Sequence, residues 1–143
     1  MSKHHIVYID GNEPRRAHDS DAGYDLTANI PAPTVLAPGE RRLIPTGFRI
    51  SIPTGWAGLV IPRSGLAAKH GITVLNAPGL IDPGYTGDVG VVLHNTDMAD
   101  AFNIAPGDRI AQLVLTRVEH PVFVHEDLGD SDRGSNGFGS TGR

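Results

Sequence analysis

Hydrophobic residues in this chain form short runs, and glycine and proline interrupt these runs at short intervals. The runs are rich in Val, Ile, Leu and Thr, most of which favour extended backbone. Short strands separated by turn residues about every 8–12 positions are typical of an all-β sandwich or barrel. The pattern therefore predicts strands at residues 6–9, 24–30, 47–53, 57–62, 88–95, 108–118 and 121–124.

One segment departs from this pattern and predicts a short helix at residues 64–71, with the sequence SGLAAKHG. Ala67 and Ala68 favour a helix, Ser64 can cap its start, and Gly71 can end it. No other segment has the amphipathic period of a helix. We therefore expect residues 1–143 to form a single all-β domain with one short helix.

The last part of the chain, residues 127–143, is rich in Gly and Ser and has few side chains to bury. Such a composition favours a flexible segment. We expect a mobile C-terminal arm at these residues.

Charge and composition narrow the classes of function. The net charge is −4, which argues against non-specific binding to nucleic acid, although a few focused Arg residues could still hold a small anion. The absence of Cys excludes disulfides and thiolate chemistry. No stretch approaches the ~18 apolar residues of a membrane span, and the N-terminus has no apolar signal region. These features predict a cytoplasmic protein without nucleic-acid or membrane partners.

The first candidate site lies at the start of the predicted helix, where Arg63 and Ser64 follow a strand. Free backbone N–H groups and the positive end of the helix dipole favour a phosphate there. Arg63 can add two parallel hydrogen bonds and Ser64 a hydroxyl group. The alternative is that Ser64 only caps the helix and Arg63 is an ordinary surface charge.

The second candidate site lies in residues 75–95, where an apolar turn contains Asp82. Asp is common in turns, so this residue alone is not diagnostic. Glycines recur through residues 79–90, on both arms of what we expect to be a hairpin, and they let the backbone approach a flat ligand closely. Strand N–H and C=O groups match the edge of uracil, and a tight hairpin excludes a 5-methyl group. Tyr85 is expected to face this ligand rather than the core.

The third candidate site follows a Pro-Gly-Asp turn at residues 106–108. In the strand after it, strict alternation cannot place Ile110 and Leu113 on one face, away from Arg109. This predicts a β-bulge or burial on both faces. Gln112 is polar within an apolar run and needs a partner if it is buried, either in the core or on a ligand.

The fourth candidate site is in the arm, where GFGSTG at residues 137–142 matches the G-x-G-x-x-G dinucleotide motif. That motif requires a following helix, and none is predicted. Successive glycine N–H groups can nevertheless surround phosphate oxygens. Arg133 can add charge, and Phe138 can stack on a base. The alternative is an arm without a role.

Together these stretches resemble the trimeric dUTP diphosphatase (dUTPase) family, whose five motifs occur here in order. The resemblance covers nearly the whole chain, and five ordered motifs are far more specific than any one of them. The motifs are DAGYDLTA (21–28), PRSGLA (62–67), NAPGLIDPGYTGDVGVVLHN (76–95), PGDRIAQL (106–113) and RGSNGFGSTG (133–142).

The resemblance implies a jelly-roll-like β fold, a homotrimer, and Mg²⁺ held mainly by the phosphates of the substrate. It implies hydrolysis of dUTP to dUMP and pyrophosphate, which lowers dUTP and supplies dUMP for thymidylate synthesis. Active sites would lie between subunits. The C-terminal arm of one subunit would close over a site that the other two build.

The resemblance also implies roles for individual residues. Asp82 would orient and activate the attacking water, because a carboxylate is ionised at neutral pH and can accept a proton. Asp25 would contact waters on Mg²⁺, which keeps several waters when phosphates bind it. Tyr85 would lie under the deoxyribose and block a 2′-hydroxyl, and Phe138 would lie over the uracil. The other implied contacts are Arg63, Ser64, Gly65 and Gln112 to phosphates, Asn76, Leu80, Ile81 and Gly90 to deoxyuridine, and Arg133, Gly139, Ser140 and Thr141 as the phosphate clamp of the arm.

The implied mechanism is in-line attack of water on the α-phosphorus, with Mg²⁺, Arg63 and Arg133 offsetting the developing charge. Two other functions compete with it. The related dCTP deaminases carry a Glu three residues before the Asn that ends the third motif. Here Val92 occupies that position before Asn95, and Val cannot do acid–base work. A non-catalytic dUTP-binding regulatory module would be favoured by loss of Asp82 or of the arm, and this chain has both.

Overall fold

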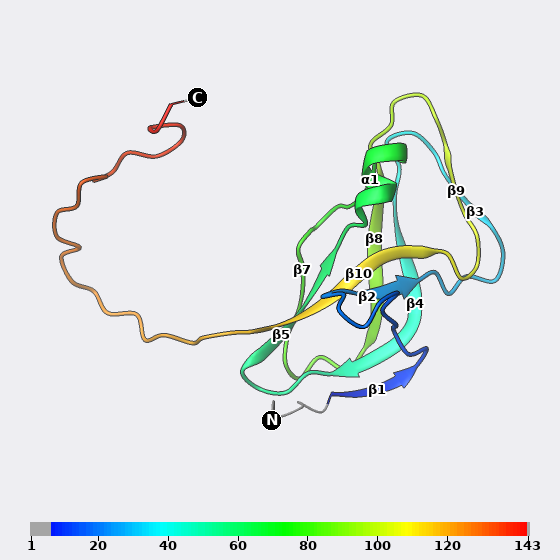
Figure 1. The fold of residues 1–143 in the computed structure, drawn as a ribbon, viewed down its shortest axis with the longest axis horizontal. Coiled ribbons are helices and arrows are strands. Elements are labelled where there is room, and N and C mark those ends of the chain that lie inside the picture. Colours follow the sequence, from blue (N-terminus) through cyan, green and yellow to red (C-terminus); the bar gives the residue numbers. More distant parts are fainter. Residues whose placement is uncertain (1–6, 143) are drawn as a thin grey trace.

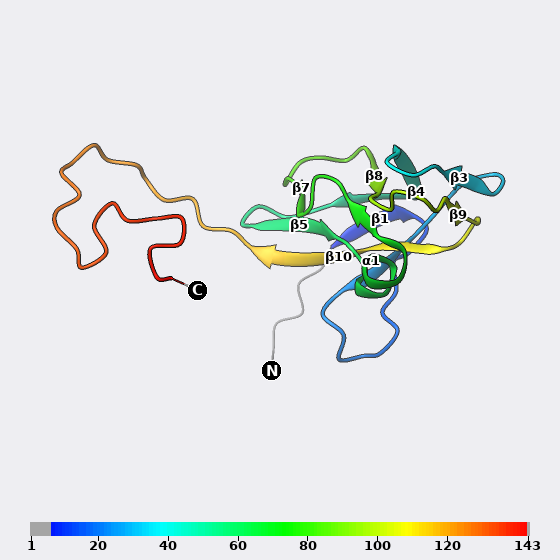
Figure 2. The ribbon, with the colours of Figure 1, turned by 90° about the horizontal axis from the view of Figure 1, so that it is seen from above.

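The architecture is a β-sandwich with one short helix and a long extended C-terminal segment (Figures 1 and 2). The computed structural model describes residues 7–142, so the first residue of the strand predicted at 6–9 and the last residue of the arm lie outside it. The elements in chain order are β1 (Tyr8–Gly11), β2 (Tyr24–Thr27), β3 (Thr34–Leu36), β4 (Arg41–Ser51), β5 (Trp56–Ile61), α1 (Ser64–His70), β6 (Ile72–Val74), β7 (Gly79–Ile81), β8 (Asp88–Asn95), β9 (Phe102–Ile104) and β10 (Arg109–Arg117).

Two antiparallel four-stranded sheets form the body. Their strand orders are β1-β4-β8-β6 and β2-β10-β5-β7, and β3 and β9 form a separate two-stranded sheet. From β4 to β8, successive strands alternate between the two larger sheets. This arrangement confirms the predicted jelly-roll-like all-β fold.

The core between the sheets is mainly aliphatic. Along β4 and β8, buried and more exposed residues alternate, so one face of each strand packs inward. Phe48 of β4 and Leu93 of β8 join Leu26 of β2 and Ile110 of β10 in one apolar cluster. The two large sheets therefore stabilise each other through a shared core, whose burial is the main favourable term in folding.

β10 contains the predicted bulge, which decides the position of Gln112. Ile110 and Ala111 are both buried although they are adjacent, and the ladder to β2 shifts register between Arg109 and Ala111. After this shift Gln112 lies opposite Asp25 in β2 and opposite Ile61 in β5. The bulge thus brings the third candidate site beside the first motif.

The short helix forms where the sequence predicted it, but its start differs in detail. Ser64 is already the first helical residue, and extended Arg63 takes the cap position without a side-chain cap hydrogen bond. The prediction that Ser64 caps the helix is therefore wrong. Gly71 ends the helix as predicted, in the left-handed conformation at φ 64° and ψ 23°, and its N–H donates to the carbonyl of Ala67.

Residues 75–95 do not form the predicted hairpin. β7 pairs with β5, whereas β8 pairs with β4 and β6, so the two arms belong to different sheets. The Leu75 N–H donates to the carbonyl of Val92, which continues the β6–β8 pairing by one residue. The glycine-rich segment between β7 and β8 therefore crosses from one sheet to the other and does not fold back as a hairpin.

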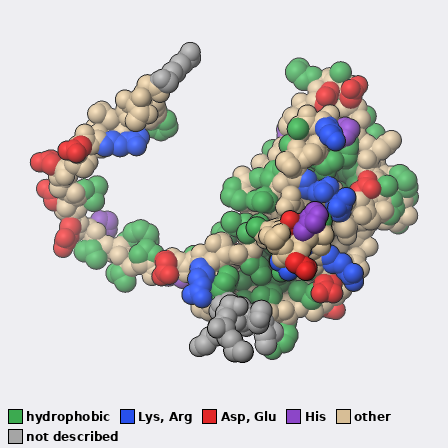
Figure 3. All heavy atoms as spheres, in the orientation of Figure 1, with side chains coloured by type: hydrophobic (Ala, Val, Ile, Leu, Met, Phe, Trp, Pro, Cys, Tyr) green, Lys and Arg blue, Asp and Glu red, His purple; other side chains and the backbone are tan. Residues whose placement is uncertain are grey.

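Within residues 7–142, the C-terminal segment pairs with no strand. Every residue from 119 to 142 is exposed, and the segment leads away from the end of β10 (Figure 3). The strand predicted at 121–124 is wrong: Val122, Phe123 and Val124 are 87%, 92% and 70% exposed and pair with no strand. The exposed segment therefore begins about eight residues earlier than the arm predicted at 127–143.

Candidate functional site

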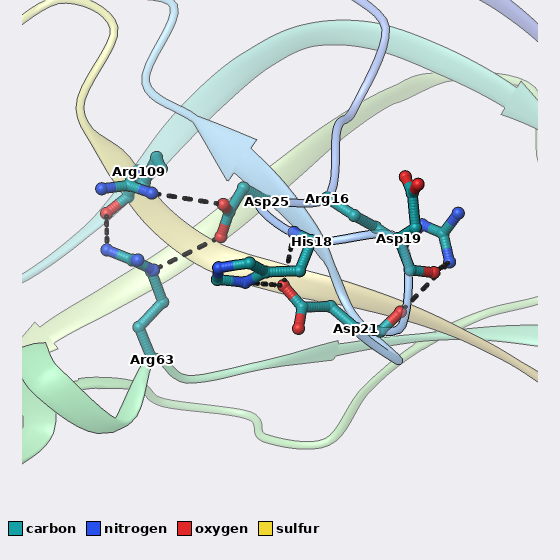
Figure 4. Close-up of polar contacts among 7 residues, drawn as sticks. All are labelled: Arg16, His18, Asp19, Asp21, Asp25, Arg63 and Arg109. Atoms are coloured by element: carbon teal, nitrogen blue, oxygen red, sulfur yellow. Dashed lines mark hydrogen bonds and ion pairs between the residues drawn. The ribbon is translucent and has the colours of Figure 1, made fainter.

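Asp25, Arg63 and Arg109 come from three different segments and meet in one cluster (Figure 4). Asp25 lies in β2, Arg63 directly precedes α1, and Arg109 begins β10. Asp25 Oδ1 is 3.4 Å from Arg63 Nε, and Asp25 Oδ2 is 3.6 Å from Arg109 Nη1. The Arg63 Nη1 atom also donates to the Arg109 carbonyl oxygen at 3.4 Å. Asp25 therefore holds two cations in place and offsets part of their charge.

The loop before β2 holds Asp25 from the other side. The Asp25 N–H donates to the Arg15 carbonyl oxygen at 2.7 Å. Further along the loop, the His18 N–H donates to Asp21 Oδ2 at 2.9 Å, and the His18 ring approaches the same oxygen (Figure 4). The backbone hydrogen bond from His18 is the main cause that lowers the pKa of Asp21 below its ordinary value.

A cavity of about 290 Å³ opens beside this cluster, at the junction of β5, α1 and β10. It contains all four residues that were predicted to contact phosphates, and it carries three Lys, Arg or His side chains but no carboxylate. Its lining residues are Arg63, Ser64, Gly65, Leu66, Lys69, His70 and Gln112.

Gln112 faces this cavity rather than the core. It is only half-buried, and in the described part of the chain no hydrogen bond satisfies its side-chain amide. Its side chain lies over Gly23, where an added Cβ would come within 2.4 Å of Gln112 Oε1. Of the two alternatives for Gln112, these contacts favour a residue that is free to bind a ligand.

A second cavity, of about 230 Å³, lies where β7 leads into β8. Asp82 and Tyr85 line its turn, and the Tyr85 hydroxyl donates to the Asp88 carbonyl oxygen at 2.9 Å. Tyr85 is 48% exposed, so it is not a core aromatic. The cavity brings together most of the residues predicted to surround the nucleoside. Its lining residues are Leu80, Ile81, Asp82, Tyr85, Asp88, Val89 and Gly90.

Asn76 lies next to this second cavity but does not line it. An added Cβ at Gly79 would be 3.2 Å from Asn76 Nδ2, so the amide covers the start of β7. At Gly90 an added Cβ would come within 2.7 Å of a methyl group of Leu43 in β4. The glycines here let neighbouring side chains lie close to bare backbone.

The two cavities share no lining residue, and the arm reaches neither of them. Phe138 is fully exposed, and Arg133 Nε donates to the Asn136 carbonyl oxygen, also in the arm, at 2.8 Å. Figure 1 shows the end of the arm well away from the sheets. One chain therefore presents three separate parts of the predicted site: the phosphate set, the nucleoside set with Asp82, and the clamp of Arg133, Phe138, Gly139, Ser140 and Thr141.

Besides Leu66, sequence reasoning missed four residues that the structure brings to the first cavity or its edge. Arg109 had been considered only as a strand residue, and Gly23 only as part of a motif. Lys69 and His70 lie four residues after Gly65 and Leu66. On the predicted helix this spacing places Lys69 and His70 on the same face as Gly65 and Leu66. The sequence could have indicated them by this spacing.

Two further observations concern ligands and membranes. Within residues 7–142 there is no group of three or more His, Asp or Glu side chains that could hold a metal ion by themselves. None of the helices described is both long and apolar enough to cross a membrane.

Comparison with known proteins gives consistent matches. The dUTPase family model matches residues 10–142. The deoxyuridine 5'-triphosphate nucleotidohydrolase of Thermobifida fusca is 55% identical over 130 residues, covering 90% of this chain and 72% of that protein. The protein of the same name in Tropheryma whipplei is 49% identical over 139 residues, covering 96% of this chain and 94% of that protein.

Solved structures show the same fold. The dUTPase of Staphylococcus bacteriophage 80alpha, determined with dUPNHPP, matches with a TM-score of 0.86 and 30% identity over 96% of this chain and 99% of that one. A variant dUTPase from phage phi11 of S. aureus matches with a TM-score of 0.77 and 27% identity over 89% of this chain and 100% of that one. The latter structure describes the coordination of a structural Mg(II) ion.

Proposed function

The chain belongs to the dUTPase family, and from this we propose that it hydrolyses dUTP to dUMP and pyrophosphate. In a cell this activity lowers dUTP and supplies dUMP for thymidylate synthesis. The observation that carries the proposal is the sorting of residues between two cavities. Phosphate-binding types line one, and Asp82, Tyr85, Gly90 and apolar residues of β7 and β8 line the other.

The active form in this proposal is a homotrimer with sites between subunits. The phosphate cavity and the nucleoside cavity share no residue, and the arm contacts neither. A complete site then needs the phosphate cavity of one copy, the nucleoside cavity of a second and the arm of a third. A closed trimer with three equivalent interfaces satisfies this requirement by symmetry.

Residues of the chain supply positioning and charge in this reaction. Asp82 orients a water for in-line attack on the α-phosphorus and accepts its proton. Arg63, held by Asp25, and Arg133 of the arm offset charge that develops on the phosphates. Gln112 and Ser64 fix the phosphates in the first cavity, and Phe138 of the arm covers the uracil.

Mg²⁺ fits this site as an ion bound mainly by the substrate. The described residues contain no carboxylate cluster that could cage a metal, whereas Mg²⁺ is commonly held by phosphates and one carboxylate and keeps several waters. Asp25 would contact those waters. When bound, Mg²⁺ would supply further neutralisation of the phosphate charge.

The chemistry of residue 92 argues against the related deamination. Deaminases of this fold need a Glu at that position, and Val92 of β8 has no group that can transfer a proton. No feature of the described residues favours the binding module over the enzyme, since Asp82 remains in a cavity that can admit a ligand.

Pyrophosphate release with Mg²⁺ tests the proposal. The purified chain would be given dUTP, dCTP, dTTP or UTP in separate reactions, and the products would be identified by chromatography. We expect fast release from dUTP alone, with dUMP as the other product. Tight dUTP binding without release would overturn the proposed reaction in favour of a binding module.

Replacing Asp82 by Asn tests its role in the same assay. Asp82→Asn keeps the size and the turn but removes the proton acceptor, so we expect at least ~10²-fold slower turnover with nearly unchanged dUTP binding. Asp100→Asn, at an exposed turn outside both cavities, is the matched control and is expected to behave as the wild type. Near-wild-type turnover of Asp82→Asn would remove Asp82 from the mechanism.

A further inference from the structure

We propose that Lys69 determines the preference for a triphosphate by binding the terminal phosphate of the nucleotide. The inference rests on the proposed function and adds to it a phosphate contact from a residue outside the five motifs. Lys69 lies just after the PRSGLA motif, and its side chain lines the phosphate cavity.

The first argument is the charge of the cavity. The chain as a whole has a net charge of −4, yet this cavity is lined by Arg63, Lys69 and His70 and by no Asp or Glu. Figure 3 shows Lys and Arg side chains gathered on the face of the body that carries α1. A local excess of positive charge in an acidic protein indicates a strongly anionic ligand, because it focuses the field where that ligand binds.

The second argument is which of these charges is free to bind. Asp25 lies 3.4 Å from Arg63 and already offsets part of its charge. Within residues 7–142 no ion pair involves Lys69. A flexible ammonium group without a carboxylate partner can satisfy a phosphate oxygen without first breaking another contact.

The third argument is the geometry of the helix. Lys69 is four residues after Gly65, so the two lie on the same face one turn apart. Helical side chains lean back toward the N-terminus, so Lys69 points toward the Gly65 end of the helix. Apart from its chain neighbours and the helix backbone, no atom of the described residues lies within 4 Å of the position that a Cβ of Gly65 would take, so the Lys69 side chain leaves that position open. The bare helix surface therefore leaves room for a phosphate between Lys69 and Ser64.

The fourth argument is that the backbone of Lys69 is held in place by its neighbours. The next residue, His70, packs its ring against Phe102 of β9, with ring centroids 5.2 Å apart. Gly71 then ends the helix with a hydrogen bond to the Ala67 carbonyl. These contacts fix the last helical turn, so only the side chain of Lys69 needs to be ordered on binding.

The test compares binding of three probes, namely inorganic tripolyphosphate, dUpNHpp and dUMP, by calorimetry. Lys69→Met keeps most of the side-chain length and removes the charge, and Lys69→Arg keeps the charge. We expect Lys69→Met to bind tripolyphosphate and dUpNHpp about tenfold more weakly. Its affinity for dUMP should equal that of the wild type, because dUMP lacks the terminal phosphate. Lys69→Arg should restore binding.

The outcomes separate this inference from the proposed function. If the wild type hydrolyses dUTP but Lys69→Met binds dUpNHpp and tripolyphosphate as tightly as it does, the inference is wrong and the function stands. If the affinity of Lys69→Met for all three probes falls equally, Lys69 does not bind the terminal phosphate specifically, and the inference is wrong. If Lys69→Met loses only the polyphosphate probes while the wild type fails to hydrolyse dUTP, the inference stands and the proposed reaction is wrong.

Discussion

Asn95 and Gln112 show how polar side chains are used differently in this molecule. Asn95 is fully buried, and each of its polar atoms has a partner. Its Nδ2 donates to the carbonyls of Leu36 and Asp100, and its Oδ1 accepts from the Asp97 N–H. The Gln112 amide, in contrast, has no partner in the described chain. Because buried polar groups are normally satisfied, Asn95 belongs to the fold and Gln112 is available to a ligand.

Removing the Asn95 amide should destabilise the protein strongly. Asn95→Ala removes a buried donor from the Leu36 carbonyl and part-buried partners from the Asp100 carbonyl and the Asp97 N–H, so we expect a loss of about 2–4 kcal/mol in the free energy of unfolding. Asn103→Ala, at an exposed position of β9, is the control and should change it by less than about 0.5 kcal/mol. Denaturant unfolding at one protein concentration measures both. A loss below about 1 kcal/mol in Asn95→Ala would contradict this role.

Asp97 should make the adjacent turn sensitive to acid. Its Oδ1 accepts the N–H groups of Asp100 and Ala99, each at 2.8 Å, and these bonds lower the pKa of Asp97 below its ordinary value of 3.8. A lowered pKa in the folded state stabilises the fold above the ordinary value, and this contribution is lost as pH falls through the lowered pKa.

Asp97→Asn tests this dependence, because Asn cannot titrate. We expect the stability difference between wild type and variant to be constant above about pH 5 and to shrink as the pH falls below 3.8. Unfolding midpoints measured from pH 7 to pH 2 would show it. A difference that stays constant down to pH 2 would show that the Asp97 charge has no part in stability.

At the scale of elements, the β2–β10 pair positions Gln112 in the phosphate cavity, whose other lining residues are Arg63 and residues of α1. The bulge in β10 sets Gln112 opposite Asp25, and the Gln112 side chain then lies over Gly23. An added Cβ at Gly23 would be 2.4 Å from Gln112 Oε1, which no ordinary contact allows. The close approach of Gly23 and Gln112 therefore links the first motif to the fourth.

Gly23→Ala should weaken phosphate binding by displacing Gln112. We expect KM for dUTP to rise roughly three- to tenfold, which corresponds to the loss of about one ordinary hydrogen bond. Because both changes would act on the same contact, the double variant Gly23→Ala with Gln112→Ala should be no worse than Gln112→Ala alone. Additive losses in KM would show that Gly23 acts through something other than Gln112.

At the scale of the whole molecule, the predicted site is divided into three parts that one chain does not assemble. The phosphate and nucleoside cavities are separate, and the segment of residues 119–142 lies in the open (Figure 1). Because this segment buries nothing, deleting residues 133–143 should leave the fold intact and remove most of the activity. Full activity of the shortened chain would exclude a role for the arm.

Mixing two inactive variants tests whether the parts come from different copies. In mixed trimers of Asp82→Asn and the chain lacking residues 133–143, some sites would combine an intact Asp82 from one copy with an intact arm from another. Random mixing should restore activity in about one quarter of the sites. Each variant alone, treated identically, is the control. Mixed oligomers that stay inactive, verified with subunits of different mass, would contradict shared sites.

Much of this protein was predictable from local pattern. Short runs of aliphatic residues between glycines and prolines predicted an all-β fold, because alternation and turn chemistry act within a few residues. β8 matched its predicted bounds, and Gly71 ended the helix as expected. Arg63 and Gln112 could be recognised as candidate ligand contacts because they are polar residues in or beside apolar strands. Both line one cavity.

Only the tertiary structure decided which strands pair and which side chains meet. Residues 75–95 were predicted to form a hairpin, but β7 pairs with β5, because strand pairing depends on the whole sheet and not on the turn alone. Residues 121–124 have strand composition but pair with no strand that the structure describes, and they are exposed. The meeting of Asp25 with Arg63 and Arg109 joins positions far apart in sequence, and only folding places them within 4 Å.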